Sequence, residues 1–204
     1  MPFYRVGLTG NVASGKSTVL ALFRAWGAAT TDADALAREV VRPGSATQQR
    51  IVEQFGSDLI LPDGTLDRAR LRRRVMDDPV RRAALEAIIH PEVTRRAAEL
   101  EAAARQAGAS IIVHDIPLLF EVLDPGNFDA VVLVDAPYAE RRRRLVELRG
   151  LSPPEADQLL AAQLPAELKR ARATWTIDND GDLGALEARA RQIWERLQAA
   201  ARSA

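Results

Sequence analysis

The sequence predicts an α/β fold: a five-stranded parallel sheet between helical layers, with a helical insertion and a helical lid. Three observations lead to this prediction. Two continuous apolar runs, 110–116 and 130–135, are typical of strands buried on both faces of a parallel sheet. Strand-like segments alternate with segments of helical periodicity. Finally, a loop with the spacing G-x-x-x-x-G-K-[ST] joins the first strand to the first helix, as in the three-layer P-loop NTPase fold.

The loop runs from Gly10 to Thr18 between a strand of alternating apolar and polar residues at 4–9 and a helix that Gly27 ends. Loop N–H groups and the positive end of the helix dipole then face one concavity, which suits a polyphosphate. Lys16 is expected to reach the β- and γ-phosphates, and Ser17 to place its hydroxyl on Mg²⁺. The motif predicts a bound nucleoside triphosphate.

Composition narrows the classes of function. The 204 residues suit one domain with insertions, and 28 basic residues balance 28 acidic ones, so overall charge attracts neither nucleic acid nor an acidic membrane. With no cysteine there is no disulfide and no thiolate site, and two histidines make a histidine metal cluster unexpected. The beginning of the chain lacks an apolar signal segment, and no apolar run suits a membrane span. We expect a cytoplasmic protein, a monomer or weak homo-oligomer.

After the first helix, a short strand at 28–32 precedes a helix that breaks at 42–45. A helix around Ile51 to Phe55 follows, then an extended turn at 59–66, a helix capped by Asp67, and a helix from Pro79 that His90-Pro91 should interrupt. A long helix then runs from about Glu92 to Gln106 and ends at Gly108. This stretch is too long and too helical for one crossover, so 34–108 is expected to be an insertion that binds the acceptor substrate.

The remaining segments complete the sheet. Strands are predicted at 110–116, 130–135 and 175–178, and a last helix places Leu183, Leu186, Ala190, Ile193, Trp194 and Leu197 on one face. Two helices, one beginning near Arg141 and one near Ser152, are interpreted as a lid over 139–167 that closes to exclude water. The nucleotide core then comprises 1–33, 109–138 and 168–204.

Carboxylates follow several predicted strands, where the site of an open α/β sheet lies. They are Asp32 and Asp34, then Asp115 and Asp135. Phosphoryl transfer needs a carboxylate to orient or deprotonate the acceptor, which Asp32 or Asp34 could supply, although either could simply cap the following helix. The apolar segment Pro117–Glu121 could be core or could wall an acceptor site, and His90 more readily pins a loop than performs catalysis.

Several short blocks together resemble the dephospho-CoA kinase family from about residue 4 to 190. They are Gly7–Gly10 and Ser14–Thr18, Asp32–Asp34 with Leu36–Arg38, Pro43-Gly44, Phe55-Gly56, Asp63–Arg68, His90-Pro91, Asp115–Glu121, Gln163 and Ile177–Asn179. The resemblance implies ATP-dependent phosphorylation of the ribose 3′-hydroxyl of dephospho-CoA, the last step of CoA synthesis, with Mg²⁺ as cofactor.

The resemblance also implies roles for residues. Asp34 is the candidate general base, Asp32 helps to orient acceptor or metal, and Lys16 and Arg144 stabilise charge on the migrating phosphoryl group. The implied ATP-binding residues are Asn11, Val12, Ala13, Ser14, Gly15, Lys16, Ser17, Thr18, Arg144 and Asn179, with Asn179 near the adenine. The implied acceptor-binding residues are Thr9, Asp34, His90, Pro117, Leu118, Leu119, Phe120 and Glu121.

The chain departs from the family pattern in a few places. Asn11 and Ala13 stand where glycines are usual; Asn tolerates left-handed backbone angles and Ala13 occupies a variable motif position, so we expect the loop to survive. Arg141 stands where the family often has Gln. Leu148 stands where the family usually has an arginine, and in this chain the arginine, Arg149, comes one position later. The alternative functions are another small-molecule kinase acting on a nucleoside or nucleotide, or a GTP-dependent switch. A GTP-dependent switch would normally contain an Asn-Lys-x-Asp stretch that recognises guanine, and its absence from the sequence argues against this alternative.

Overall fold

The computed structural model describes residues 3–203, and its centre is a parallel sheet in the strand order β2-β3-β1-β4-β5. The strands are β1 (Tyr4–Gly10), β2 (Ala29–Asp32), β3 (Ile111–Asp115), β4 (Ala130–Asp135) and β5 (Trp175–Asp178). In the centre of the sheet, Val6 of β1 pairs with Val113 on one side and Ala130 on the other. The predicted α/β class and five-stranded parallel sheet are confirmed, and the pairing order brings the ends of β1, β3 and β4 side by side.

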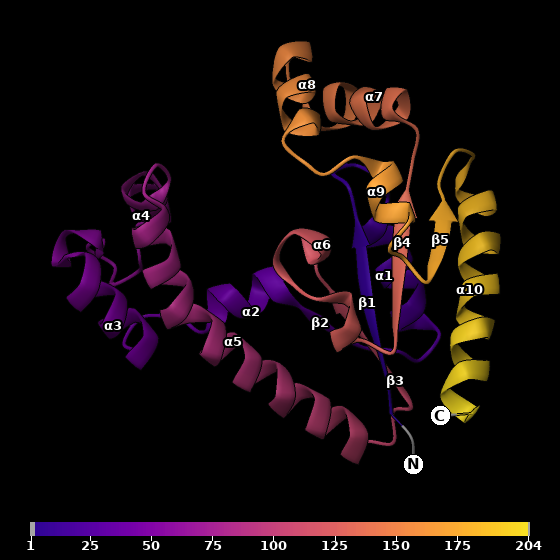
Figure 1. Ribbon diagram of the computed structural model, residues 1–204, viewed down its shortest axis with the longest axis horizontal. Coiled ribbons are helices and arrows are strands. Elements are labelled where there is room, and N and C mark those ends of the chain that lie inside the picture. The colour runs from indigo at the N-terminus through magenta and orange to yellow at the C-terminus, as the bar shows by residue number, and fades with distance from the viewer. Residues whose placement is uncertain (1–2, 204) are drawn as a thin grey trace. The chain divides into compact units, whose positions relative to one another are not determined.

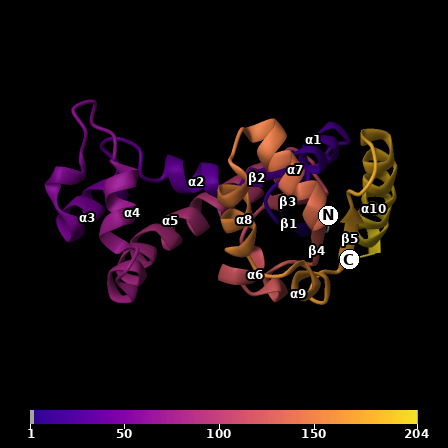
Figure 2. The same cartoon turned by 90° about the horizontal axis from the view of Figure 1, so that it is seen from above.

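Helices cover both faces of this sheet (Figures 1 and 2). On one face, α1 (Lys16–Ala25) and α10 (Leu183–Ser203) bury Phe23, Trp194 and Leu197 against the strands. On the other face, α6 (Leu119–Val122) lies so close to β1 that a Cβ at Gly7 would stand 2.5 Å from Leu119 Cδ1. Leu183, expected on the buried face of α10, is 65% exposed, because it occupies the first position of the helix before the chain turns onto the sheet.

Three further helices follow β4 in the chain. They are α7 (Tyr138–Arg149), α8 (Pro153–Ala161) and α9 (Ala166–Arg170). A short 3₁₀ helix, η2 (Pro125–Asn127), comes before β4 and after α6. Gly150 ends α7 at φ 70°, where glycine carries no Cβ penalty, and Ser152 with Glu155 forms a capping box that begins α8. Leu145 of α7 and Ala156 and Leu160 of α8 pack together, with Val12 and Ala13 against them. The two helices therefore pack on the phosphate-binding loop.

The chain divides into two compact units, one comprising the residues up to Thr31 and from Ala104 onward, the other Asp32–Ala103. We call them the core unit and the insertion unit. The insertion unit contains α2 (Ala33–Glu39), α3 (Ala46–Phe55), η1 (Ser57–Leu59), α4 (Arg68–Val75) and most of α5 (Pro79–Gln106). It has its own apolar core, in which Ile51 and Leu59 are completely buried.

Local sequence signals explain where these helices begin. Asp32, Ser45 and Asp67 each accept a backbone N–H bond at the start of α2, α3 and α4. Ile60 and Leu66 form an antiparallel bridge around a turn that contains Gly64 at φ 81°. The cap at Asp67 and the extended turn are as predicted.

One prediction for this unit is wrong. Pro91 does not interrupt the helix; it lies inside the continuous helix α5. A proline in a helix removes one backbone hydrogen bond and bends the helix locally. Here strong helix formers such as Ala, Leu, Glu and Arg flank Pro91 on both sides and outweigh that loss.

In the part of the chain that the structure describes, no helix is both long and apolar enough to span a membrane.

Candidate active site

The phosphate-binding loop joins the carboxyl end of β1 to the first turn of α1. The N–H groups of Ala13, Gly15, Lys16 and Ser17 donate no hydrogen bond within residues 3–203, so they remain available to a ligand. Both motif glycines are required because neighbouring atoms approach them too closely to leave room for a side chain. A Cβ at Gly10 would stand 2.5 Å from the Val134 carbonyl oxygen, and a Cβ at Gly15, which has φ 97°, would collide with the Asn179 amide. Free N–H groups at a helix N-terminus form a site for phosphate.

The two positions that depart from the usual glycines have different roles. Ala13 adopts φ 60° and is the one non-glycine residue of 3–203 with a positive φ. Asn11 is buried and donates from Nδ2 to the Leu164 carbonyl at 3.3 Å. The loop survives as expected, but Ala13 rather than Asn11 carries the left-handed conformation, at a steric cost of about 1 kcal/mol. Nearby, the Val12 N–H donates to Gln163 Oε1 at 2.8 Å, and Ser14 is buried.

Arg144 and Asn179 reach the loop from distant parts of the core unit. Arg144 Nη1 donates to the Ala13 carbonyl at 3.1 Å, and Asn179 Nδ2 donates to the Ser14 carbonyl at 2.7 Å. Glu140 holds Arg144 Nε at 2.9 Å on the same helix face. The structure therefore brings both residues beside the loop, where the guanidinium can add positive charge to bound phosphates.

Lys16 lies at the start of α1, and its ammonium group forms an ion pair with Asp115, which ends β3. The two side chains are 13% and 11% exposed, so the pair is only weakly screened by water. Beside them, Thr9 Oγ1 donates to the Pro117 carbonyl at 3.2 Å. Neither the Asp115 partnership nor the Gln163 contact was assigned from the sequence, although a carboxylate at the end of a buried strand is a usable signal.

Ser17 and Thr18 occupy the first turn of α1, and the Ser17 side chain is exposed. No group of three or more His, Cys, Asp or Glu residues that could hold a metal occurs among residues 3–203. Mg²⁺ is commonly held by few protein oxygens together with substrate phosphates and water. The Ser17 hydroxyl beside free loop N–H groups fits that kind of site.

The segment Pro117–Glu121 follows β3 and enters α6. Leu119 and Phe120 are buried, whereas Leu118 is 44% exposed and Pro117 is half-buried. Completely buried Lys169 pairs with Glu121 at 2.8 Å. Arg172 donates to the Phe120 carbonyl at 3.0 Å and stacks over its ring. Leu119 and Phe120 thus belong to the packed interior, and α9 anchors the segment.

The arginine run at the start of α7 divides into separate roles. Arg141 is buried and donates to the Ala136 carbonyl at 3.0 Å; Arg142 pairs with Asp157 at 2.6 Å; and Arg143 pairs with Glu140 at 2.7 Å. Hydrogen bonds from Arg143, and then from Arg144, lower the pKa of Glu140 to about 2. Arg142 and Arg143 are therefore paired on the protein surface.

In the insertion unit, α2 carries the two candidate carboxylates. Asp32 Oδ1 caps the helix by accepting the Ala35 N–H at 2.9 Å. The exposed carboxylate of Asp34 makes no hydrogen bond or ion pair within residues 3–203, so it is chemically available. His90 is exposed on α5.

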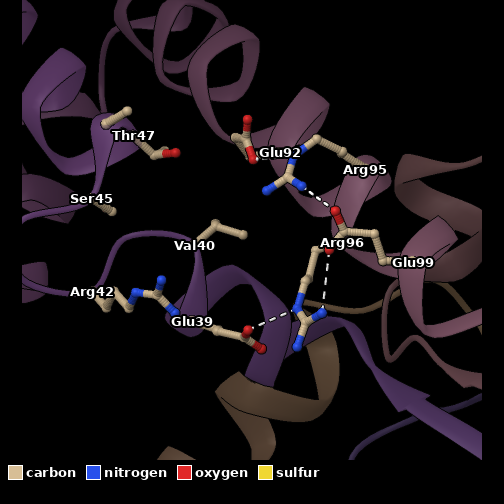
Figure 3. Close-up of a pocket in the computed structure, with 10 residues that line it drawn as sticks. Glu39, Val40, Arg42, Ser45, Thr47, Glu92, Arg95, Arg96 and Glu99 are labelled. Atoms are coloured by element: carbon tan, nitrogen blue, oxygen red, sulfur yellow. Dashed lines mark hydrogen bonds and ion pairs between the residues drawn. The ribbon is translucent and has the colours of Figure 1, made fainter. Parts of the chain in front are cut away.

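The insertion unit also contains a pocket of about 490 Å³ between the C-terminal end of α2, the start of α3 and α5. Figure 3 shows that its arginines are already engaged: Arg96 lies between Glu39 and Glu99, and Arg95 contacts Glu99. Arg95 also pairs with Glu92 at 2.8 Å. The positive charges contributed by α5 to this pocket are thus balanced by carboxylates.

The sheet order and the loop define the class of protein by its fold, the P-loop kinase fold. A solved shikimate kinase from Bacteroides thetaiotaomicron shares the fold with a TM-score of 0.51 over 96% of this chain and 98% of that chain, at 18% identity. A family model described as dephospho-CoA kinase matches residues 4–185. The chain belongs to the dephospho-CoA kinase family.

Individual relatives agree with this assignment. The chain is 46% identical to a dephospho-CoA kinase from Anaeromyxobacter dehalogenans, over 95% of this chain and 92% of the relative. It is 42% identical to one from Thermobifida fusca, over 95% and 96%. The crystal structure of TT1252 from Thermus thermophilus superposes with a TM-score of 0.83 at 39% identity, over 97% of this chain and 99% of that one.

Proposed function

We propose that the protein transfers the γ-phosphoryl group of ATP to the ribose 3′-hydroxyl of dephospho-CoA, giving ADP and CoA in the last step of CoA biosynthesis. The observation that carries this proposal is the family match over residues 4–185. The loop with its free N–H groups supplies a matching phosphate site in the core unit. Membership of this family makes the chain an ATP-dependent kinase.

In the proposed reaction, free loop N–H groups and Arg144 hold the ATP phosphates. Lys16 stabilises the negative charge of the migrating group, and Asp115 holds its ammonium before the nucleotide arrives. Bound at the Ser17 hydroxyl and the phosphates, Mg²⁺ would neutralise charge on the phosphate oxygens. Asp34 accepts the proton of the 3′-hydroxyl as its oxygen bonds to the γ-phosphorus and the bond to ADP breaks.

The remaining residues that the family resemblance implies are assigned to substrate binding. Thr9 with the Pro117–Glu121 segment, and His90 in the insertion, are assigned to the acceptor, with Pro117 and Leu118 retaining exposed surface for it. Asp32, whose second oxygen is not needed for the helix cap, would orient acceptor or metal. Asn179 is assigned to the adenine side, and α7 and α8 to a lid that excludes water. A monomer or weak homo-oligomer in the cytoplasm remains our expectation.

An ADP-release assay tests the proposal directly. The protein is given MgATP with dephospho-CoA, adenosine, AMP or no acceptor, and the product is identified by mass. Release that depends on dephospho-CoA and yields CoA is expected. Release only with adenosine or AMP would identify a nucleoside or nucleotide kinase instead, and release independent of every acceptor would indicate an NTPase.

Asp34→Asn tests the proposed base. Because general acid–base groups contribute about 10²–10⁴-fold, turnover should fall by at least about two decades while ATP affinity stays near that of the unmodified protein. Steady-state kinetics and nucleotide titration give the two values. Near-normal turnover in this variant would exclude Asp34 from proton transfer.

A further inference from the structure

Two arginines stand beside the candidate base in the insertion unit. Arg38 follows Asp34 by one helical turn on the same face of α2, about 6 Å along the axis. Its Nε donates to the Asp34 carbonyl at 3.1 Å, which fixes the guanidinium on that face. Arg68, the first residue of α4, reaches the same helix and donates from Nη2 to the Ala37 carbonyl at 3.4 Å.

Among the described residues, these two guanidinium groups lack an ion-pair partner. Neither forms an ion pair with any carboxylate in residues 3–203, and only backbone carbonyls hold them in place. Partial burial lowers the pKa of Arg68, and the positive charge of Arg38 lowers it further. Two like charges are therefore held near each other on α2 at an electrostatic cost that a bound anion would remove.

The arginines from α5 that line the nearby pocket of the insertion unit differ in this respect. Arg95 and Arg96 are each neutralised by glutamates (Figure 3). A phosphate group arriving there would compete with carboxylates already in place. The unpaired charges of Arg38 and Arg68 make the stronger anion site, because arginine presents paired N–H donors that match phosphate oxygens.

We propose that Arg38 and Arg68 bind the diphosphate of the acceptor and so position its 3′-hydroxyl at Asp34. This inference rests on the proposed function. The 3′-hydroxyl and the 5′-linked diphosphate belong to one nucleotide, and only a few covalent bonds separate them. Asp34 and Arg38 lie one helical turn apart on one face of α2, and Arg68 of α4 reaches the Ala37 carbonyl of the same helix, which suits that arrangement. The pair then selects acceptors that carry a diphosphate.

The test compares Arg38→Gln, Arg68→Gln and the double variant with Arg73→Gln. Glutamine keeps helix propensity and part of the side-chain length. Arg73 is a matched control: it is also an exposed arginine of α4 without an ion pair, and it lies five residues from Arg68, on a different helix face. Each variant is measured for KM toward dephospho-CoA, KM toward ATP and kcat, and circular dichroism checks its fold.

Each single loss should raise KM for dephospho-CoA about tenfold or more, as expected for a charge-assisted hydrogen bond, while KM for ATP stays constant. Inorganic pyrophosphate, added at saturating MgATP, should compete with dephospho-CoA in the unmodified protein and lose potency in the double variant. Arg73→Gln should change none of these values.

A failure of the proposed function and a failure of the diphosphate site alone would give different results. If the unmodified protein does not phosphorylate dephospho-CoA, the proposed function itself fails. If it does so, but the double variant keeps its KM for dephospho-CoA within about twofold, or matches Arg73→Gln, the diphosphate site is overturned alone. Should the double variant misfold, the folded single variants and pyrophosphate competition in the unmodified protein decide the matter.

Discussion

At the scale of single residues, Ala13 shows how the loop tolerates an unusual side chain. Its φ of 60° would suit glycine, yet Arg144 binds its carbonyl and the residue packs beside Leu145, Ala156 and Leu160. The surrounding contacts therefore hold a conformation that alanine by itself disfavours.

Ala13→Gly removes that steric penalty. Because glycine also gains freedom in the unfolded chain, the net gain should be small, at most about 1 kcal/mol in the free energy of unfolding. Chemical denaturation gives the value. Ala13→Val serves as the opposite control, since a β-branched residue is disfavoured at positive φ and should be clearly destabilising.

At the scale of elements, α9 connects the segment after β3 to the rest of the core unit. Lys169 is completely buried and its ammonium meets Glu121, which retains 20% side-chain exposure. A buried lysine is stable in its charged form only with such a partner. The pair therefore fixes α6 and α9 relative to one another.

Lys169→Met should lower the free energy of unfolding by about 3 kcal/mol, because Glu121 loses its counter-charge. Replacing both partners, as in Lys169→Met with Glu121→Leu, should recover most of the loss, since apolar pairs of similar volume replace ion pairs well. Urea unfolding of the two variants forms the comparison. If the double variant were no more stable than the single one, charge pairing would not explain the role of Lys169.

The helix α7 carries a pH-dependent contact through Glu140. Its folded-state pKa of about 2 lies below its ordinary value of 4.5. A lowered carboxyl pKa contributes stability above pH 4.5 that is lost as the pH falls towards 2. Arg144 should therefore keep its Glu140 contact at neutral pH.

Glu140→Gln tests this linkage. Thermal midpoints of the unmodified protein should exceed those of the variant above pH 4.5, and the two curves should converge as the pH approaches about 2. The difference is expected to be modest because water reaches the group. A difference that stays constant over this range would contradict the assignment of the lowered pKa to Glu140.

At the scale of the whole molecule, the chain crosses between the two units twice. The crossings are at the junction of β2 and α2 and within the continuous helix α5. Asp34 lies just beyond the first crossing, and the phosphate-binding loop belongs to the core unit. Ligands of the loop should therefore stabilise the core unit first.

MgATP should raise the thermal midpoint. A ligand at one hundred times its Kd adds about 2.7 kcal/mol, which corresponds to roughly 5–10 °C for a chain of this size. Removing the metal with EDTA should reduce the shift, because the phosphates lose a cation at the Ser17 site. Lys16→Ala should likewise reduce it, and an undiminished shift in that variant would argue against the loop as the nucleotide site.

Elements with local signals could be predicted from the sequence alone. The phosphate-binding loop, the caps at Asp67 and Ser152, and the buried strand 130–135 each depend on residues within a few positions of one another. Such patterns act over one helical turn or one strand, so they can be recognised before folding is considered. The resemblance to a family added Arg144 and Asn179 as expected nucleotide-binding residues, which spacing alone does not give.

Features that depend on residues far apart in the chain became visible only in the folded structure. It set the order β2-β3-β1-β4-β5, paired Lys16 with Asp115, and placed Arg144 and Asn179 on the loop. It also carried α5 through Pro91, against the local signal for a break. These outcomes are sums of many packing and hydrogen-bonding terms across the unit, and no short stretch of sequence contains them.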